Sequence, residues 1–319
     1  MTNSKSIAAF ALTALAVALA PQAQAQSPAA KPAAAKHAGH ARTFASAEDA
    51  AKALADAVRA ADKKALFAVV GPGSDQWLLS GDAVADRNDW TRFLAAYDEK
   101  HGLEAQGEKM ILTVGGDTWP FPAPIVKRGS EWAFDSNAGR EEVLNRRVGR
   151  NELDTVQTLL AVVDAQREYA TGDPDGNGLA DYARRFVSTK GRKDGLYWPA
   201  KAGEPESPLG PLVASAAGEG YGKEAKSGER TPYHGYYYKL VTSQGKSAQG
   251  GAYDYIVGGK LLGGFAVVAW PARYGVSGVT TFIVNHDGVV YEKDLGPQTP
   301  SIAAHMTRYD PDPTWKKAQ

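Results

Sequence analysis

The spacing of apolar residues along the first half of the chain predicts helices followed by strands. Apolar positions recur every three or four residues after Ser46, a good helix N-cap, and the same period returns twice further on. Short runs rich in β-branched and aromatic residues come next. The pattern predicts helices over residues 47–61, 63–70 and 88–99, and strands over residues 109–114, 120–126 and 131–134. These segments together predict a small α+β unit over residues 43–139.

The second half begins with the longest helical signal of the chain, over residues 140–169, and then changes to strand-like alternation. A short helical turn is expected at residues 181–186, and a long surface excursion, rich in Gly and Pro, at residues 190–230. Strands are predicted over residues 234–241, 263–272, 279–285 and 289–292, with a hairpin turn at Asp287-Gly288. One long helix packed on one antiparallel sheet is therefore expected over residues 140–319. The predicted fold class is α+β.

The beginning of the chain differs in composition from the rest. Lys5 precedes an apolar run, residues 7–20, which is too short to span a bilayer comfortably, and Ala23-Gln24-Ala25 is typical of a cleavage site. We expect a signal peptide over residues 1–25, cleaved after Ala25, and a disordered Ala/Pro/Lys tether over residues 26–42. No later run is apolar for long enough to be a transmembrane helix. The expected location is the periplasm or the outside of the cell.

Composition then limits the chemistry and the partners. The chain has no Cys, which excludes disulfides, thiolate nucleophiles and Cys-ligated metal sites. The predicted signal peptide contains one of the 36 basic residues and none of the 36 acidic residues, so the remainder carries 35 basic against 36 acidic residues. This balance argues against nucleic acid or an anionic membrane surface as the main partner. The oligomeric state stays open.

One segment is similar to a calcium-binding loop. Residues 173–181 place side-chain oxygens at relative positions 1, 3, 5 and 9 and a glycine at position 6. The twelfth position, where such a loop needs a bidentate acid, is Arg184. The alternatives are a calcium site that is incomplete and a polar turn at the end of the long helix, with Arg184 or Arg185 neutralising the aspartates. The expected metal ligands are Asp173, Asp175, Asn177, the carbonyl of Leu179, and Asp181.

An aromatic run predicts a contact surface at Tyr233, His234, Tyr236, Tyr237 and Tyr238. On a strand, Tyr236 and Tyr238 point to one face and Tyr237 to the other. One set is expected in the core, and the other could form an exposed stacking platform for a glycan or a peptide.

The sequence predicts no catalytic residue. It lacks a Gly-x-Ser-x-Gly motif, and the Ser243-x-x-Lys246 match lies in a turn between strands, not at the start of a helix. One alternative is a hydrolase of envelope polymers, for which Glu141, Glu142 and Asp287 are the candidate acids or bases. An enzyme of this kind needs carboxylates that face one another across a cleft.

Several motifs are similar to those of one bacterial family. They are Trp119-Pro-Phe-Pro-Ala-Pro, Trp132-Ala-Phe-Asp, the stretch from Gly139-Arg-Glu-Glu to Glu152, Asp164-Ala-Gln-Arg-Glu-Tyr169, Tyr233-His-Gly-Tyr-Tyr-Tyr-Lys-Leu240 and Pro271-Ala-Arg-Tyr-Gly-Val-Ser-Gly278. Over about residues 43–295 the chain resembles the exported family catalogued as domain of unknown function 2950. That family has no established activity, so the resemblance implies export and no particular reaction.

The second half also resembles the globular part of type IV pilins and pseudopilins, in which a helix packs on an antiparallel sheet and a loop sometimes holds calcium. The long helix of this chain is internal, so the resemblance does not imply polymerisation through an N-terminal helix. The sequence favours a non-catalytic binding or assembly module of the cell envelope, with an envelope protein or a glycan as partner. The alternatives are the carboxylate hydrolase and a calcium-stabilised structural partner protein.

Overall fold

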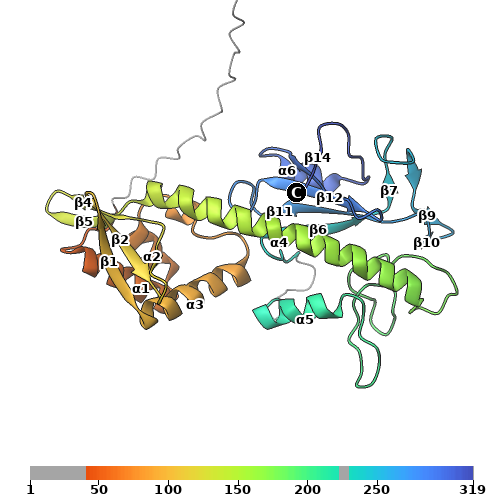
Figure 1. The fold of residues 1–319 in the computed structure, drawn as a ribbon, viewed down its shortest axis with the longest axis horizontal. Coiled ribbons are helices and arrows are strands. Elements are labelled where there is room, and N and C mark those ends of the chain that lie inside the picture. The colour runs from red at the N-terminus through yellow and green to blue at the C-terminus, as the bar shows by residue number, and fades with distance from the viewer. Residues whose placement is uncertain (1–40, 223–229, 319) are drawn as a thin grey trace, which may run out of the picture. The chain divides into compact units, whose positions relative to one another are not determined.

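The computed structural model describes residues 41–222 and 230–318, which belong to one compact unit. The predicted signal peptide and nearly all of the predicted tether lie outside the described residues. The fold class is α+β, as predicted (Figure 1). The helices are α1 (Ala47–Arg59), α2 (Lys63–Val70), α3 (Ala83–Glu99), α4 (Ser136–Gly172), α5 (Gly210–Glu219) and α6 (Thr299–His305), with a short 3-10 helix η1 (Ser74–Gln76).

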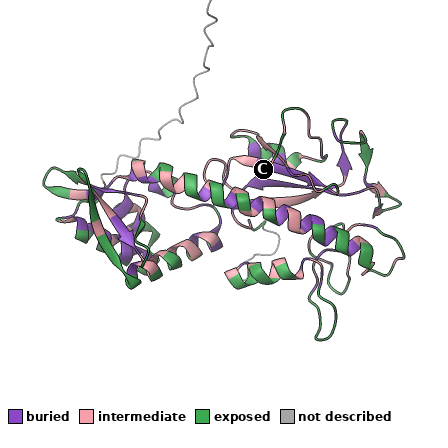
Figure 2. Ribbon diagram, in the orientation of Figure 1, coloured by how far each residue is buried: buried purple, intermediate pink, exposed green. Residues whose placement is uncertain are grey.

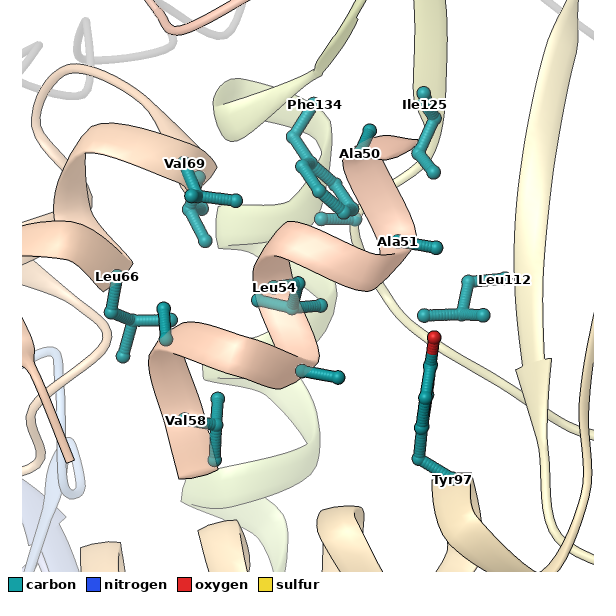
Figure 3. Packing of buried hydrophobic residues seen from close by; sticks show 14 of the residues in the cluster. Ala50, Ala51, Leu54, Val58, Leu66, Val69, Tyr97, Leu112, Ile125 and Phe134 are labelled. Carbon is teal, nitrogen blue, oxygen red and sulfur yellow. The ribbon is translucent and has the colours of Figure 1, made fainter. Parts of the chain in front are cut away.

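The first sheet and helices α1 to α3 enclose one hydrophobic core. The sheet is antiparallel in the order β1-β2-β4-β5, with β3 paired to β2. Figure 3 shows side chains from the helices and the sheet gathered around Leu54 of α1, which is 1% exposed. The predicted cap of α1 is confirmed, because the Ser46 hydroxyl accepts a hydrogen bond from Asp49 N–H. The strands are β1 (His101–Gln106), β2 (Lys109–Val114), β3 (Trp119–Pro120), β4 (Ile125–Arg128) and β5 (Glu131–Phe134).

The prediction of one strand over residues 120–126 was wrong. The segment contains two short strands, β3 and β4, that pair with different parts of β2. Pro120, Pro122 and Pro124 lack the N–H group that a continuous ladder needs, so the chain cannot pair along its whole length here. The result is a bend that carries Trp119 and Phe121 beside α3 and α4.

The second sheet packs on the long helix, as predicted. It is antiparallel in the order β14-β13-β12-β11-β6, and Leu159, Val162 and Val163 of α4 belong to the core on one face. Helix α6 contributes Ala303 to the core on the other face. Every residue of β11 is buried, because both faces of this central strand are covered (Figure 2). The strands are β6 (Tyr236–Val241), β11 (Ala266–Pro271), β12 (Thr280–Asn285), β13 (Tyr291–Asp294) and β14 (Lys316–Lys317).

Two small ribbons and the predicted hairpin turn complete the second half. The ribbons pair β7 (Ser243–Gln244) with β8 (Tyr253–Asp254) and β9 (Ile256–Val257) with β10 (Lys260–Leu261). The turn at Asp287-Gly288 is confirmed by the hydrogen bond from Gly288 N–H to Asn285 O. Among the described residues, no helix is long and apolar enough to cross a membrane.

Two predictions between the long helix and the second sheet were wrong. Residues 181–186 form no helical turn, because Tyr182 pairs with Leu261 and the Gln166 amide makes two hydrogen bonds to the backbone of Ala183. The segment over residues 190–230 is not purely a surface excursion: it contains α5, and its residue Leu196 is fully buried. Long-range contacts that no local pattern shows decide both segments.

Candidate functional site

One concave site in the described part of the chain is a pocket with a cavity of about 380 Å³, which we call the arginine-lined pocket. Residues of α1, α3, the β3 bend and the first half of α4 surround it. Its floor reaches the first core at Leu54, Val58 and Leu66. Aromatic side chains supply much of the remaining wall: Trp77, Trp90, Phe93, Trp119 and Phe121.

Local sequence explains how the aromatic wall forms. Trp90, Phe93 and Tyr97 follow helical spacing and lie on one side of α3, as the sequence predicts. The proline-rich bend places Phe121 against this side, with 5.4 Å between the ring centroids of Phe93 and Phe121. Trp119 stays 45% exposed at the mouth of the pocket. The pocket thus has an apolar interior and an open aromatic edge.

The charged lining is strongly unbalanced. Four arginines and one aspartate line the pocket: Arg92, Arg146, Arg147, Arg150 and Asp89. Arg150 binds Asp89 through two parallel hydrogen bonds, with Nη1–Oδ1 and Nη2–Oδ2 distances of 3.1 and 3.0 Å. Arg92 forms an ion pair with the same carboxylate. Burial alone would lower the pKa of Arg150, but the hydrogen bonds to Asp89 outweigh it and raise this pKa.

Arg146 and Arg147 extend the positive lining along α4. The Arg146 guanidinium lies 5.0 Å from the centre of the Trp119 ring, and its Nε donates to Glu142 at 2.6 Å. Arg147 is 8% exposed and donates to two backbone carbonyls, to Trp77 O at 2.6 Å and to Leu78 O at 3.1 Å. Burial lowers the pKa of Arg147, and the nearby Asp86 charge opposes this effect. A buried cation is therefore held in the pocket wall by carbonyl dipoles.

The predicted contact surface lies elsewhere, and its strand tyrosines point inward. Tyr236 is fully buried, and its hydroxyl donates to Thr280 O at 3.0 Å. Tyr238 packs on the same core as Tyr236, and Tyr237 packs on the opposite one. The predicted alternation is therefore present, but both faces of β6 are covered. The strand tyrosines form no open stacking platform.

Tyr233 and His234 lie at a junction of α4 and α5. His234 Nε2 is 2.9 Å from Glu219 Oε2, and His234 Nδ1 is 3.3 Å from Asp154 Oδ2. The imidazole stacks on Tyr233 with 4.1 Å between ring centroids. Burial, with the charges of Glu219 and Asp154, raises the pKa of Tyr233 to about 12. The backbone φ of His234 is +50°, which is unfavourable for a residue with a side chain, so these contacts hold a strained turn.

Asp82, which the sequence did not single out, connects this junction to α3. Its Oδ1 accepts from the N–H groups of Val84 and Ala85 and so caps the helix. Its Oδ2 accepts from the Tyr221 hydroxyl at 2.9 Å and from Gly235 N–H at 3.0 Å. Asp82 is 1% exposed, and all these donors satisfy its buried charge. This junction is a structural link between α3, α4 and α5.

The calcium-like loop satisfies its own oxygens. Asp173 ends α4 with φ of +43°, and its two carboxylate oxygens accept from Asn177 N–H and Gly178 N–H. The Lys260 ammonium lies 2.9 Å from Asp175 Oδ2 and 3.6 Å from Asp181 Oδ2.

The remaining members of the loop also find partners within the protein. The amide of Asn177 donates to Asp181 at 2.8 Å and its oxygen accepts from Leu179 N–H, while Arg184 donates to Gly259 O. Within the described residues no group of three or more His, Asp or Glu side chains is arranged to hold a metal ion. Lys260 is the main counter-charge, not Arg184 or Arg185. A calcium ion would have to replace Lys260, and the calcium site stays a prediction from the sequence.

The candidate carboxylates of a hydrolase do not meet. Glu142 lies in the second turn of α4 and pairs with Arg146, and Glu141 beside it is exposed. Asp287 lies at the other end of the helix, where its carbonyl and that of His286 accept from Arg167. Glu142 and Arg167 are 25 positions apart in α4, which is about 37 Å along the helix axis. Glu141 or Glu142 therefore cannot face Asp287 across a cleft.

Comparison with known proteins gives one match. A family model described as a protein of unknown function, DUF2950, matches residues 41–318. The chain belongs to this family. No curated protein and no solved structure matches it. The family resemblance found in the sequence is confirmed, whereas the resemblance of the second half of this DUF2950 chain to pilins stays a prediction.

Sequence reasoning missed the arginine-lined pocket, although parts of its signal were visible. The helical spacing of Trp90, Phe93 and Tyr97 and the Trp119-Pro-Phe-Pro segment are both visible in the sequence. Arg146 and Arg150 are four positions apart and therefore share one face of α4. The sequence could not show that these three features converge, because α4 is separated from α3 by five strands.

Proposed function

We propose that this DUF2950 protein is an exported, non-catalytic binding protein of the cell envelope, and that the arginine-lined pocket holds its ligand. The observation that carries the proposal is an apolar cavity of about 380 Å³ with an aromatic edge. Small-molecule sites are usually concave, mostly apolar and roughly 300–1,000 Å³ in volume. The export part rests on the signal-like features of residues 1–25.

Two features of the pocket favour binding over catalysis. Its single carboxylate, Asp89, is engaged by two arginines and is not available as an acid or base. The carboxylates proposed for a hydrolase are separated by about 37 Å along α4. A ligand that enters this pocket meets an apolar wall and guanidinium groups, which bind and orient but do not attack.

A neutral fluorescent probe tests the pocket directly. 1-Aminoanthracene is apolar and uncharged, and its emission increases when it leaves water. We expect saturable binding of one probe per protein expressed from the full-length chain. Val143→Phe should weaken the affinity at least about tenfold, because the added ring occupies the cavity. The intact mass of protein recovered from the periplasm, starting at Gln26, checks export.

The matched control is Leu153→Phe, which adds a similar side chain at a position on α4 that is 68% exposed and outside the pocket. This variant should bind the probe like the wild type. Both variants should keep the far-UV circular dichroism spectrum and the Tm of the wild type within a few degrees. Absence of probe binding, or equal binding by both variants, would refute the pocket as the ligand site.

A further inference from the structure

The charge of the arginine-lined pocket identifies the class of ligand that it fits. Four guanidinium groups line the cavity with one carboxylate, and Glu142 pairs with Arg146 from outside the lining, so an excess of positive charge remains. We propose that the ligand is a single-chain amphiphile with a carboxylate head, a proposal that rests on the pocket being the binding site. The apolar chain lies along the aromatic wall, and the head binds the arginines of α3 and α4.

Asp89 shows how the pocket binds a carboxylate. This side chain lies between Arg92 and Arg150 and receives two parallel hydrogen bonds from Arg150 at 3.0 and 3.1 Å. Parallel pairing of this kind is the strongest and most specific contact between arginine and a carboxylate. One carboxylate is shared by two guanidinium groups, which leaves a positive charge beside the cavity. A second carboxylate, brought by the ligand, compensates it.

Arg147 adds a buried positive charge to the wall of the pocket. Its guanidinium is buried in the pocket wall and donates hydrogen bonds to the carbonyls of Trp77 and Leu78. Carbonyl dipoles fix the orientation of the guanidinium but do not cancel its charge. The charges of Asp86 and Asp89 compensate that of Arg147 in part, and an anionic ligand adds to this compensation, because little water screens a buried charge.

The volume of the cavity suits a ligand with one alkyl chain. A water molecule takes about 30 Å³ of liquid volume, and a methylene group has a similar size, so about 380 Å³ accommodates roughly a dozen carbon atoms. A two-chain phospholipid is too large to enter completely. The apolar lining, with Phe93 and Phe121 in contact, suits a flexible alkyl chain.

Displacement of the neutral probe by ten-carbon amphiphiles tests the head group. Decanoate, decanol and decyltrimethylammonium share one alkyl chain and differ in charge. We expect decanoate to bind at least about tenfold more tightly than decanol, and the cation to bind most weakly. Raising the ionic strength from about 0.01 M to about 1 M should lower the affinity for decanoate, because salt screens the charges. The affinity for decanol should stay nearly unchanged.

Chain length tests the body of the ligand. Each methylene that enters the cavity should raise the affinity about fourfold, from hexanoate upward. The increase should stop at roughly twelve carbons, when the cavity is full. An affinity that keeps rising with longer chains, or a phospholipid that competes better than dodecanoate, would overturn the single-chain assignment.

Two substitutions with opposite expected effects distinguish a binding role from a structural one. Arg150→Gln should lower the affinity for decanoate at least about fivefold, because it removes one guanidinium. It should change the affinity for decanol less than about twofold. Asp89→Asn should raise the affinity for decanoate, because it removes the carboxylate that competes with the ligand for Arg92 and Arg150. The control is Arg192→Gln, on an exposed loop outside the pocket. It should leave the affinities for decanoate and decanol unchanged.

The results separate this inference from the proposed function. If the neutral probe binds and Val143→Phe abolishes its binding, the pocket is a ligand site. Equal affinities for decanoate and decanol would then overturn the carboxylate class alone. If Asp89→Asn and Arg150→Gln both lower the affinity for decanoate, the ion pairs maintain the shape of the pocket, and Asp89 does not compete with the ligand for the arginines. This result also overturns the inference.

Discussion

At the scale of single residues, charge compensation is what the sequence predicts least well. The sequence showed the aspartates of the 173–181 loop and suggested Arg184 or Arg185 as their partners. The structure brings in Lys260 from the β9–β10 ribbon, 85 positions from Asp175. Local spacing shows which oxygens lie together, but it cannot show which distant cation neutralises them. The same holds for Asp82, whose Oδ2 accepts from two donors more than 130 positions away.

Lys260→Met should lower the free energy of unfolding by about 1 kcal/mol near neutral pH, because it leaves Asp175 and the buried Asp181 without their cation. Burial would raise the pKa of Asp175, but its hydrogen bonds with Lys260 and Asn177 outweigh this effect and lower it. The hydrogen bond to Asp175 raises the pKa of Lys260. The contribution of Asp175 to the free energy of unfolding is therefore present above the pKa of about 3.9 that this carboxyl has in the unfolded chain. It is lost as the pH falls through the lower pKa of the folded state.

The contribution of Lys260 to the free energy of unfolding is present below the pKa of about 10.4 that lysine has in the unfolded chain. It is lost as the pH rises through the higher pKa of the folded state. Urea unfolding of wild type and Lys260→Met should thus differ most between about pH 5 and pH 9 and converge in acid. The control Lys246→Met, at an exposed turn, should match the wild type. Millimolar calcium should raise the Tm of Lys260→Met more than that of the wild type, since the two carboxylates are then free. A difference that is constant from pH 3 to pH 9 would contradict this explanation.

At the scale of secondary-structure elements, the long helix was the most predictable part of the fold. Its apolar period predicted residues 140–169, and α4 runs from Ser136 to Gly172. The prediction missed the helical residues next to the caps at each end: Asp135 accepts from Ala138 N–H, and Asp173 adopts a left-handed conformation. The two-residue strands β7 to β10 were not predicted, because elements this short have no measurable period.

Helix α4 contains two glycines that should respond in opposite directions to the same substitution. A Cβ at Gly149 would meet no atom within 4 Å, so Gly149→Ala should stabilise the protein by about 0.5–1 kcal/mol through helix propensity. A Cβ at Gly139 would lie 2.5 Å from Ala123 Cβ and 3.0 Å from Ala123 Cα. Gly139→Ala should therefore destabilise by about 1–3 kcal/mol. Thermal unfolding of the two variants compares them, and destabilisation by Gly149→Ala would show that the helix is not regular there.

At the scale of the whole molecule, α4 connects the two hydrophobic cores. Val143 and Leu144 pack on the first core, and Leu159 and Val163 lie in the second. The division predicted between residues 139 and 140 falls inside this helix, so both predicted units share it. Further bonds join them: the Tyr221 hydroxyl donates to Asp82 at 2.9 Å, and Arg273 donates to Gln76 O at 2.9 Å. The sequence indicated the units, whereas their connection depends on contacts between distant residues.

Because the two cores share one helix and several buried hydrogen bonds, we expect them to unfold together. Leu112→Ala removes a fully buried side chain from the first core and should lower the free energy of unfolding by about 2–5 kcal/mol. If unfolding is cooperative, hydrogen exchange through global opening should accelerate about thirtyfold or more in peptides from β2 and also in peptides from β12. Leu153→Ala, at a 68% exposed position of α4, is the control and should leave both rates unchanged. Acceleration confined to β2 would mean that the first core opens separately while α4 stays docked on the second sheet. The arginine-lined pocket would then open with the first core, and probe binding by Leu112→Ala should fall in parallel with the exchange protection of β2.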